Sequence, residues 1–226
     1  MVKYCLPIIR NTVKEVDEAL AAAASAYDCF EVWLDYLDER PIETLEEWCR
    51  RLHGRLLLLF RRQGLETVRM PAAERARIMA LAGGYGSYID IDINTQQDDL
   101  RALASCAPRP PAILSYHDYS GTPETAVLES LAARMIEAKA DICKLACYCN
   151  SPQDAIRLLA VQQQLLARGV RHLVLGMGRF GAATRIFGTL WGNEFVFAPA
   201  EHGQESAPGQ LTRPELERIF EALGEV

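Results

Sequence analysis

The regular alternation of short apolar stretches with longer helical patterns is the feature that most limits how this chain can fold. Eight stretches rich in aliphatic and β-branched residues are typical of buried strands, and a segment with helical periodicity follows each of them. Strands separated by helices must run parallel, and these units repeat about every 25 to 30 residues. The pattern therefore predicts an α/β fold, a (β/α)8 TIM barrel, formed as a single domain over residues 1–226. A doubly wound open sheet is the alternative, which the count of eight units disfavours.

The boundaries of the predicted elements follow from turn and capping residues. We predict strands at residues 2–9, 29–34, 55–60, 88–93, 112–116, 140–146, 170–175 and 194–198, and helices at residues 12–26, 41–52, 71–82, 96–105, 123–138, 152–168, 182–190 and 213–223. Thr12 and Thr212 are predicted helix N-caps, and the pair Gly83 and Gly84 is predicted to end the third helix. A polar loop at about residues 199–211 separates the last strand from the last helix.

Composition argues against several classes of partner and location. The formal net charge of −6 disfavours nucleic acid and anionic membrane surfaces as partners. No apolar run reaches the roughly 18 residues of a membrane span, and no signal-peptide pattern precedes the first predicted strand. The seven cysteines are odd in number and irregularly spaced, which fits reduced thiols better than a disulfide framework. We therefore expect a cytoplasmic protein.

One lysine stands in the middle of an apolar strand. Side chains alternate between the two faces of a strand, so Lys144 shares a face with Ile142 and Ala146. Burial disfavours the charged form of an amine, which is one way in which proteins make a lysine nucleophilic. The alternative is a lysine near a strand end whose ammonium group reaches water.

Other polar residues lie where a parallel barrel places its active site, at the C-terminal ends of strands and in the loops that follow. These residues are Glu31, Arg61, Ser115, His117, Met177, Arg185 and Gln210. Each one alone is explained by a hydrogen-bonded or solvated side chain. Their shared location favours a functional site.

Glu31 is expected to be buried. It shares a strand face with Trp33 and Asp35, while the apolar Phe30, Val32 and Leu34 share the other face. If the apolar face packs on the helices, Glu31 points into the barrel mouth. An unpaired buried carboxylate is costly, so Glu31 should have a partner, for which His117 and Arg61 are the candidates.

Five segments of the chain form a set in a fixed order. They are Tyr88–Asp92, Ile113–Tyr119, Asp141–Ala146, Gly176–Arg185 and the sequence Ser-Ala-Pro-Gly-Gln at residues 206–210. This set resembles the type I 3-dehydroquinate dehydratases, the Schiff-base enzymes of the shikimate pathway, over nearly the whole chain. The resemblance implies a TIM barrel and a hydro-lyase that converts 3-dehydroquinate into 3-dehydroshikimate without a metal or a cofactor.

The resemblance also implies roles for individual residues. Lys144 would form an imine with the substrate ketone, and His117 would remove and return protons. The substrate would be bound by Glu31, Arg61, Met177, Arg185, Ser206 and Gln210. Ser206 and Gln210 would act from a lid, the loop at about residues 199–211. A homodimer, the commonest soluble assembly, is compatible with the sequence.

The chain departs from the family pattern at residues that, by the resemblance, would bind the hydroxyl groups of the substrate. Trp33 stands where arginine is usual and Leu65 where glutamate is usual, and the segment Tyr88–Asp92 has an aspartate where a glutamate is usual. Glu66 is one residue away from the place of the missing glutamate. Three hypotheses therefore stay open: a dehydratase, a Schiff-base lyase or aldolase that acts on a related keto acid, and a binding paralogue without turnover.

Two further motifs have simpler explanations. Residues 176–181 match the GxGxxG pattern of dinucleotide sites, but no acidic residue ends the following strand, so a tight turn is the better interpretation. Cys143, Cys147 and Cys149 do not have the spacing of a zinc or iron–sulfur ligand set, and we expect buried thiols.

Overall fold

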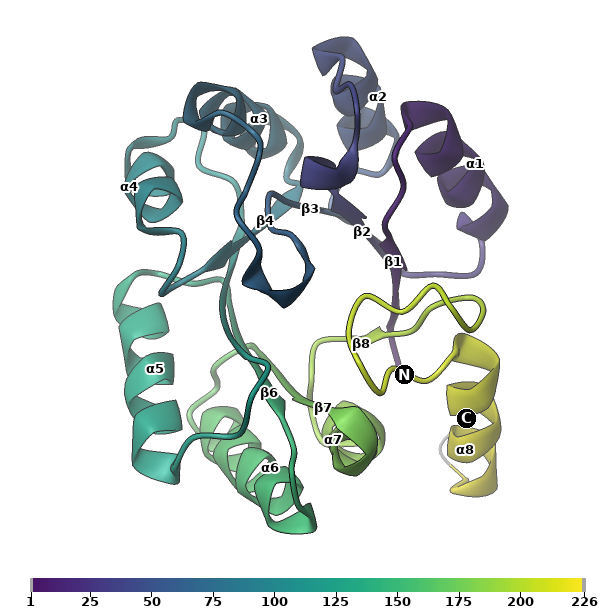
Figure 1. Cartoon of the computed structure of the whole chain (residues 1–226), viewed down its shortest axis with the longest axis vertical. Coiled ribbons are helices and arrows are strands. Elements are labelled where there is room, and N and C mark those ends of the chain that lie inside the picture. Colours follow the sequence, from purple (N-terminus) through teal and green to yellow (C-terminus); the bar gives the residue numbers. More distant parts are fainter. Residues whose placement is uncertain (1, 225–226) are drawn as a thin grey trace. The chain divides into compact units, whose positions relative to one another are not determined.

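The computed structural model describes residues 2–224 and contains the predicted alternation of strands and helices (Figure 1). The strands are β1 (Tyr4–Ile8), β2 (Cys29–Trp33), β3 (Leu56–Leu59), β4 (Tyr88–Asp92), β5 (Ala112–Asp118), β6 (Ile142–Tyr148), β7 (His172–Met177) and β8 (Val196–Phe197). The α-helices are α1 (Val13–Ala23), α2 (Ile42–Arg51), α3 (Ala72–Tyr85), α4 (Gln97–Ser105), α5 (Thr125–Glu137), α6 (Pro152–Ala167), α7 (Gly178–Leu190) and α8 (Arg213–Ala222). Two short 3-10 helices, η1 (Leu34–Tyr36) and η2 (Gln63–Leu65), were not predicted.

The chain forms two compact units. The N-terminal unit is Leu6–Ile113, and the C-terminal unit joins the residues up to Cys5 to those from Leu114 onward. In the N-terminal unit, β3 lies between β2 and β4, with Glu31 opposite Leu57. In the C-terminal unit, β6 lies between β5 and β7 with Lys144 opposite Leu173, and β8 pairs with the start of β1. All of these pairs are parallel, as the sequence predicted. The prediction of one domain over residues 1–226 remains a prediction, and residues 1, 225 and 226 lie outside the described part.

The strands are buried because helices cover them. All four residues of β3 are buried leucines, and β7 is buried along its whole length. Parallel strands covered on both faces read as continuous apolar runs, which is why these segments stand out in the sequence. In the C-terminal unit, α6 and α7 pack against β7 and against each other. Within residues 2–224, no helix combines the length and the apolar composition that crossing a membrane requires.

Side-chain caps explain why several helix starts were predictable. Thr12 accepts a hydrogen bond from the Glu15 backbone at the start of α1, and the Glu15 side chain bonds back to Thr12. Ser151 and Asp154 form the same reciprocal pair at α6. Thr212 likewise caps α8, whose first turn contains a proline. Each arrangement satisfies backbone N–H groups that have no partner inside the helix.

The predicted end of α3 at Gly83 and Gly84 is wrong. The helix continues to Tyr85, and Gly86, in the left-handed region at φ 65°, ends it. Gly83 serves a tertiary contact instead, because a Cβ atom there would lie 1.9 Å from the carbonyl oxygen of Pro108. The start of α7 was also predicted too late, since the helix begins at Gly178 rather than at residue 182.

The two adjacent glycines of α3 should respond to alanine in opposite ways. Gly83→Ala should lower the free energy of unfolding by roughly 1–3 kcal/mol, because the backbone near Pro108 must move to admit the methyl group. Gly84→Ala meets no atom within 4 Å and should raise the free energy of unfolding by about 0.5–1 kcal/mol, since alanine favours the helix. Denaturant titration of both variants measures this, and equal effects would contradict the assignment of Gly83 to the Pro108 contact.

Candidate active site

Four buried side chains on β2, on β4 and just after β3 form a group in the N-terminal unit, which we call the β2–β4 cluster: Glu31, Trp33, Arg61 and Asp90. The indole Nε1 of Trp33 donates a hydrogen bond to Oε2 of Glu31 at 2.8 Å. Nη1 of Arg61 donates to Oδ1 of Asp90 at 2.9 Å, and the Arg61 Cζ lies 5.9 Å from the centre of the Trp33 ring. The structure therefore gives Glu31 a partner, as predicted, but Trp33 was not among the candidates.

Arg61 stays charged although it is only 2% exposed. Burial opposes its charge, but the attraction and hydrogen bond of Asp90 outweigh this effect, and the charges of Asp92 and Glu31 add to it. As a result, the pKa of Arg61 is raised. The β2–β4 cluster thus holds a permanent cation next to carboxylates, which suits the binding of hydroxyl groups.

The loop after β3 that carries Arg61 is held in place by η1. The buried carboxylate of Asp35 accepts hydrogen bonds from the backbone N–H groups of Arg69 and Met70, at 2.9 and 2.7 Å. The guanidinium of Arg62 stacks on the ring of Tyr36, at 4.0 Å from its centre. These contacts fix the loop at both ends, and so they fix the backbone of Arg61.

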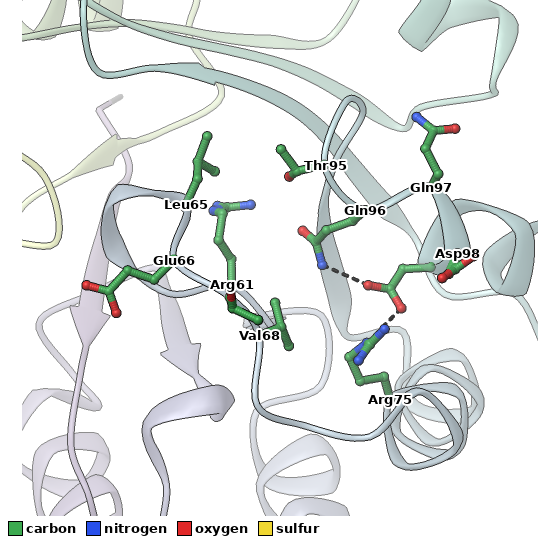
Figure 2. A pocket seen from close by; sticks show the side chains of 11 residues that line it. Arg61, Leu65, Glu66, Val68, Arg75, Thr95, Gln96, Gln97 and Asp98 are labelled. Carbon is green, nitrogen blue, oxygen red and sulfur yellow. Dashed lines mark hydrogen bonds and ion pairs between the residues drawn. The ribbon is translucent and has the colours of Figure 1, made fainter.

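A pocket of about 380 Å³ opens beside Arg61 in the N-terminal unit (Figure 2). The loop after β3 contributes Leu65 and Glu66, and the loop after β4 contributes Gln96 and its neighbours. On one wall, the Asp99 carboxylate accepts from Gln96 Nε2 and from Arg75 Nε, both at 2.8 Å.

The structure shows where Leu65 and Glu66 lie, the two residues of the loop after β3 that concern the departure from the family pattern. Leu65 lines the pocket with a left-handed backbone at φ 58°, directly after the left-handed Gly64. The Glu66 side chain is 64% exposed and pairs with Arg62 at 3.3 Å. An apolar side chain therefore occupies the position where the family pattern has a carboxylate.

Lys144 is buried on β6 of the C-terminal unit, at 4% exposure, as the alternation predicted. Its strand face also carries the buried Ile142 and Ala146. Nζ of Lys144 lies 4.6 Å from the centre of the Phe197 ring on β8. An aromatic face attracts a cation, so this contact places the ammonium group between strands rather than at the surface.

His117 lies on β5, the strand next to β6. β5 runs to Asp118, two residues beyond the predicted end, so His117 belongs to the strand itself. Its ring is half-buried and stacks on Tyr119 with 6.4 Å between ring centres. Lys144 and His117 are thus carried by neighbouring parallel strands.

Arg185 on α7 carries a buried guanidinium without a carboxylate. Its side chain is 2% exposed, and Nε and Nη1 have no hydrogen-bond partner among residues 2–224. Burial lowers the pKa of Arg185 to about 10, and the nearby Cys149 opposes this only in part. A buried cation of this kind is a candidate position for binding an anion.

The glycines of residues 176–181 allow β7 to meet α7 closely. A Cβ atom on Gly176 would lie 2.6 Å from the Cα of Gly181. The Thr184 hydroxyl accepts from the Gly176 N–H at 2.6 Å and donates to the Gly181 carbonyl at 2.7 Å. Met177 is buried at this turn. The GxGxxG pattern therefore has a packing explanation, as the sequence indicated.

The loop at residues 199–211 packs on the start of α7. Gly178 donates its backbone N–H to the Pro208 carbonyl at 3.0 Å. Gln210 accepts from the Ser206 N–H at 2.8 Å and donates from Nε2 to the Ser206 hydroxyl at 2.9 Å. Both side chains are buried, so the structure brings together the two residues that were predicted to act from this loop.

Cys143, Cys147 and Cys149 are buried free thiols, as expected. Burial raises the pKa of all three, that of Cys143 to about 11. Within residues 2–224, no group of three or more histidine, cysteine, aspartate or glutamate side chains could hold a metal ion.

Sequence reasoning missed two contacts of the candidate residues, one in each unit. The alternation that placed Glu31 and Trp33 on one face of β2 could have identified their hydrogen bond, because an indole N–H within reach of a buried carboxylate is a natural donor. Phe197 gave no local signal, since its contact with Lys144 joins strands that are far apart in the sequence.

Comparisons with known proteins agree over nearly the whole chain. A model of the type I 3-dehydroquinase family matches residues 4–226. The 3-dehydroquinate dehydratase of Methanosarcina acetivorans is 29% identical over 221 residues, which cover 93% of this chain and 91% of that protein. The 3-dehydroquinate dehydratase of Desulfotalea psychrophila is 28% identical over 223 residues, which cover 96% of each.

Solved structures of 3-dehydroquinate dehydratases have a fold similar to that of this chain. The crystal structure of 3-dehydroquinate dehydratase from Geobacillus kaustophilus has a TM-score of 0.82 at 22% identity, covering 99% of this chain and 91% of that chain. A type I enzyme from Clostridium difficile, solved with covalently modified comenic acid, has a TM-score of 0.80 at 23% identity, covering 98% and 92%. This likeness confirms the predicted α/β fold class of the (β/α)8 type.

Replacing Arg185 by methionine should stabilise the protein. A pKa lowered from the ordinary arginine value to about 10 means that folding disfavours the charged form, by on the order of 3 kcal/mol at about 1.4 kcal/mol per unit. This penalty is complete at pH 7 and fades only as the pH rises above about 10 toward the ordinary arginine pKa. Arg185→Met should therefore raise the free energy of unfolding at pH 7, as measured by denaturant titration, while it abolishes binding of a carboxylate ligand.

Replacing Arg61 by methionine should have the opposite effect on stability. Asp90, which is fully buried, would lose its cation, and breaking a buried pair costs roughly 3–5 kcal/mol. The same titration measures this. Losses of similar size in the Arg61 and Arg185 variants would refute the contrast between a paired and an unpaired guanidinium.

Proposed function

Because the chain belongs to the type I 3-dehydroquinase family, we propose that it dehydrates 3-dehydroquinate to 3-dehydroshikimate through an imine on Lys144. The curated relatives at 28–29% identity carry the name 3-dehydroquinate dehydratase. This activity would place the protein in the shikimate pathway.

The observation that carries the proposal is the buried guanidinium of Arg185, whose Nε and Nη1 have no hydrogen-bond partner among residues 2–224, in the unit that also buries Lys144. Burying an uncompensated cation is costly, so such a group is retained where a ligand supplies the anion. The substrate has one carboxylate, and arginine binds a carboxylate with two parallel hydrogen bonds. Arg185 would orient the ring by this group.

Lys144 would supply the nucleophile. Its amine adds to the C3 carbonyl of the substrate, and loss of one water gives a protonated imine. The imine draws electrons from the neighbouring carbon and so acidifies the C2 proton. The strand position holds the amine in place, since both neighbours on its face are buried.

His117 would carry the protons. Its imidazole takes the C2 proton, which leaves an enamine, and then returns a proton to the C1 hydroxyl as that group departs as water. A second water hydrolyses the imine, releases 3-dehydroshikimate and restores the lysine. The net change is the loss of one water from the substrate.

The remaining predicted residues would bind the substrate. Glu31 and Arg61 would contact ring hydroxyls, and Met177 would line the site at the end of β7. Ser206 and Gln210 would exchange their mutual hydrogen bonds for contacts with the substrate, with the loop at residues 199–211 as the lid. No step requires a metal or a cofactor.

Trp33 and Leu65 favour a second candidate, a Schiff-base lyase or aldolase for a related hydroxylated keto acid. Both are neutral at positions that are charged in the family pattern, and Leu65 lines the pocket beside Arg61. A binding paralogue without turnover is the third candidate.

Trapping with borohydride separates the three candidates. The protein is mixed with 3-dehydroquinate and sodium borohydride, and the intact mass and peptide masses are measured. We expect a reduced adduct on the peptide that contains Lys144, and, without borohydride, a rise in ultraviolet absorbance from the conjugated product. An adduct without product would indicate a paralogue that has lost the later steps, and no adduct would favour another keto acid.

The chain offers a matched lysine control. Lys14 on α1 has a side chain that is 83% exposed and pairs with Glu18 at 3.8 Å. Lys144→Ala should lose both the adduct and turnover, at least a thousandfold in kcat, because no other group supplies the amine. Lys14→Ala should keep both. An adduct that persists in Lys144→Ala would reject Lys144 as the nucleophile.

A further inference from the structure

The hydrogen bond between Trp33 and Glu31 links two side chains on one face of β2. Both are buried, and the N–O distance of 2.8 Å is that of a strong bond to a charged acceptor. An indole donates one hydrogen bond, cannot accept one, and carries no charge. Trp33 therefore fixes the direction of the Glu31 carboxylate without neutralising it.

The ring face of the Trp33 indole lies next to the guanidinium of Arg61. The guanidinium carbon lies 5.9 Å from the ring centre, and Asp90 holds the same guanidinium by a 2.9 Å hydrogen bond. Arg61 is thus held by Asp90 on one side and limited by the Trp33 ring on another. One side chain contacts both an acidic and a basic member of the β2–β4 cluster.

We propose that Trp33 is a positioning residue, which aims the Glu31 carboxylate and the Arg61 guanidinium at the hydroxyl groups of the substrate. This inference rests on the proposed function and extends it to a residue that departs from the family pattern. A carboxylate that is oriented by an uncharged donor keeps its negative charge, and a charged carboxylate is a strong acceptor for a neutral hydroxyl. Trp33 would act through Glu31 and Arg61 and would not itself react.

The chain contains a matched control for this contact. Trp48 on α2 donates its Nε1–H to Oδ1 of Asp17, also at 2.8 Å. Phenylalanine at either position keeps most of the ring and removes one indole–carboxylate hydrogen bond. Trp48→Phe therefore reports the loss of stability alone, and any additional effect of Trp33→Phe reports positioning.

The kinetic test compares the two phenylalanine variants with the parent. Trp33→Phe should raise KM about tenfold, the lower end for a hydrogen bond to a charged group, with kcat changed much less. Trp48→Phe should leave both constants unchanged. Trp33→Phe should add little to Glu31→Gln, because it acts through that carboxylate. Equal kinetics of the two phenylalanine variants would overturn the inference.

A spectroscopic test does not depend on turnover. The chain has three tryptophans, so a ¹⁵N-labelled sample gives three indole N–H signals, which the phenylalanine variants assign. Glu31→Gln should shift the Trp33 signal and leave that of Trp48 in place. Addition of 3-dehydroquinate should also shift the Trp33 signal.

The two readouts separate failure of this inference from failure of the proposed reaction. A Trp33 signal that responds to both Glu31→Gln and the ligand, in a protein that forms no product, would refute the dehydration and retain Trp33 as a positioning residue. If the protein forms product but the Trp33 signal does not shift when the ligand is added, the proposed dehydration would stand and the inference about Trp33 would be refuted. If the Trp33 signal does not shift in Glu31→Gln, the hydrogen bond between Trp33 and Glu31 would be refuted.

Discussion

Burying a charged group away from water is the constraint that shapes the candidate residues in each of the two units. Arg61 and Arg185 are equally inaccessible, yet the pKa of Arg61 is raised and that of Arg185 is lowered. The difference is the carboxylate of Asp90, which offsets the loss of hydration at Arg61. Arg185 has no such partner in the described part of the chain. Asp90 thus compensates the charge of Arg61 within the fold, and the function proposed here assigns an anionic ligand to Arg185.

Many features of the fold follow from local rules and could be predicted from the sequence. The buried strands are short apolar runs, and the helix starts at Thr12, Ser151 and Thr212 carry caps that act within four residues. The end of α3 could not be predicted, because Gly83 is required by Pro108, which lies 25 residues further along the chain. A glycine that permits a close contact looks the same in a sequence as one that ends a helix.

The candidate site residues also divide into features that follow from local sequence and features that depend on contacts between distant elements. Alternation along single strands predicted the burial of Lys144 and the shared face of Glu31 and Trp33. Contacts between elements could not be predicted from the sequence. Examples are the ring of Phe197 next to Lys144 and the pairing of Arg61 with Asp90. The exposure of Glu66 was undecidable too, since it depends on the left-handed backbone of Gly64 and Leu65.

The buried cysteines around Lys144 bear on chemoselectivity. A thiolate adds readily to a carbonyl carbon, and Cys143 and Cys147 stand on the same strand as the lysine. Their places in the alternation direct them to the opposite face, and burial raises the pKa of both thiols. At neutral pH they remain protonated and are poor nucleophiles. In the proposed reaction, this arrangement would leave the amine as the reactive group of β6, so that a keto acid would be attacked by nitrogen rather than by sulfur.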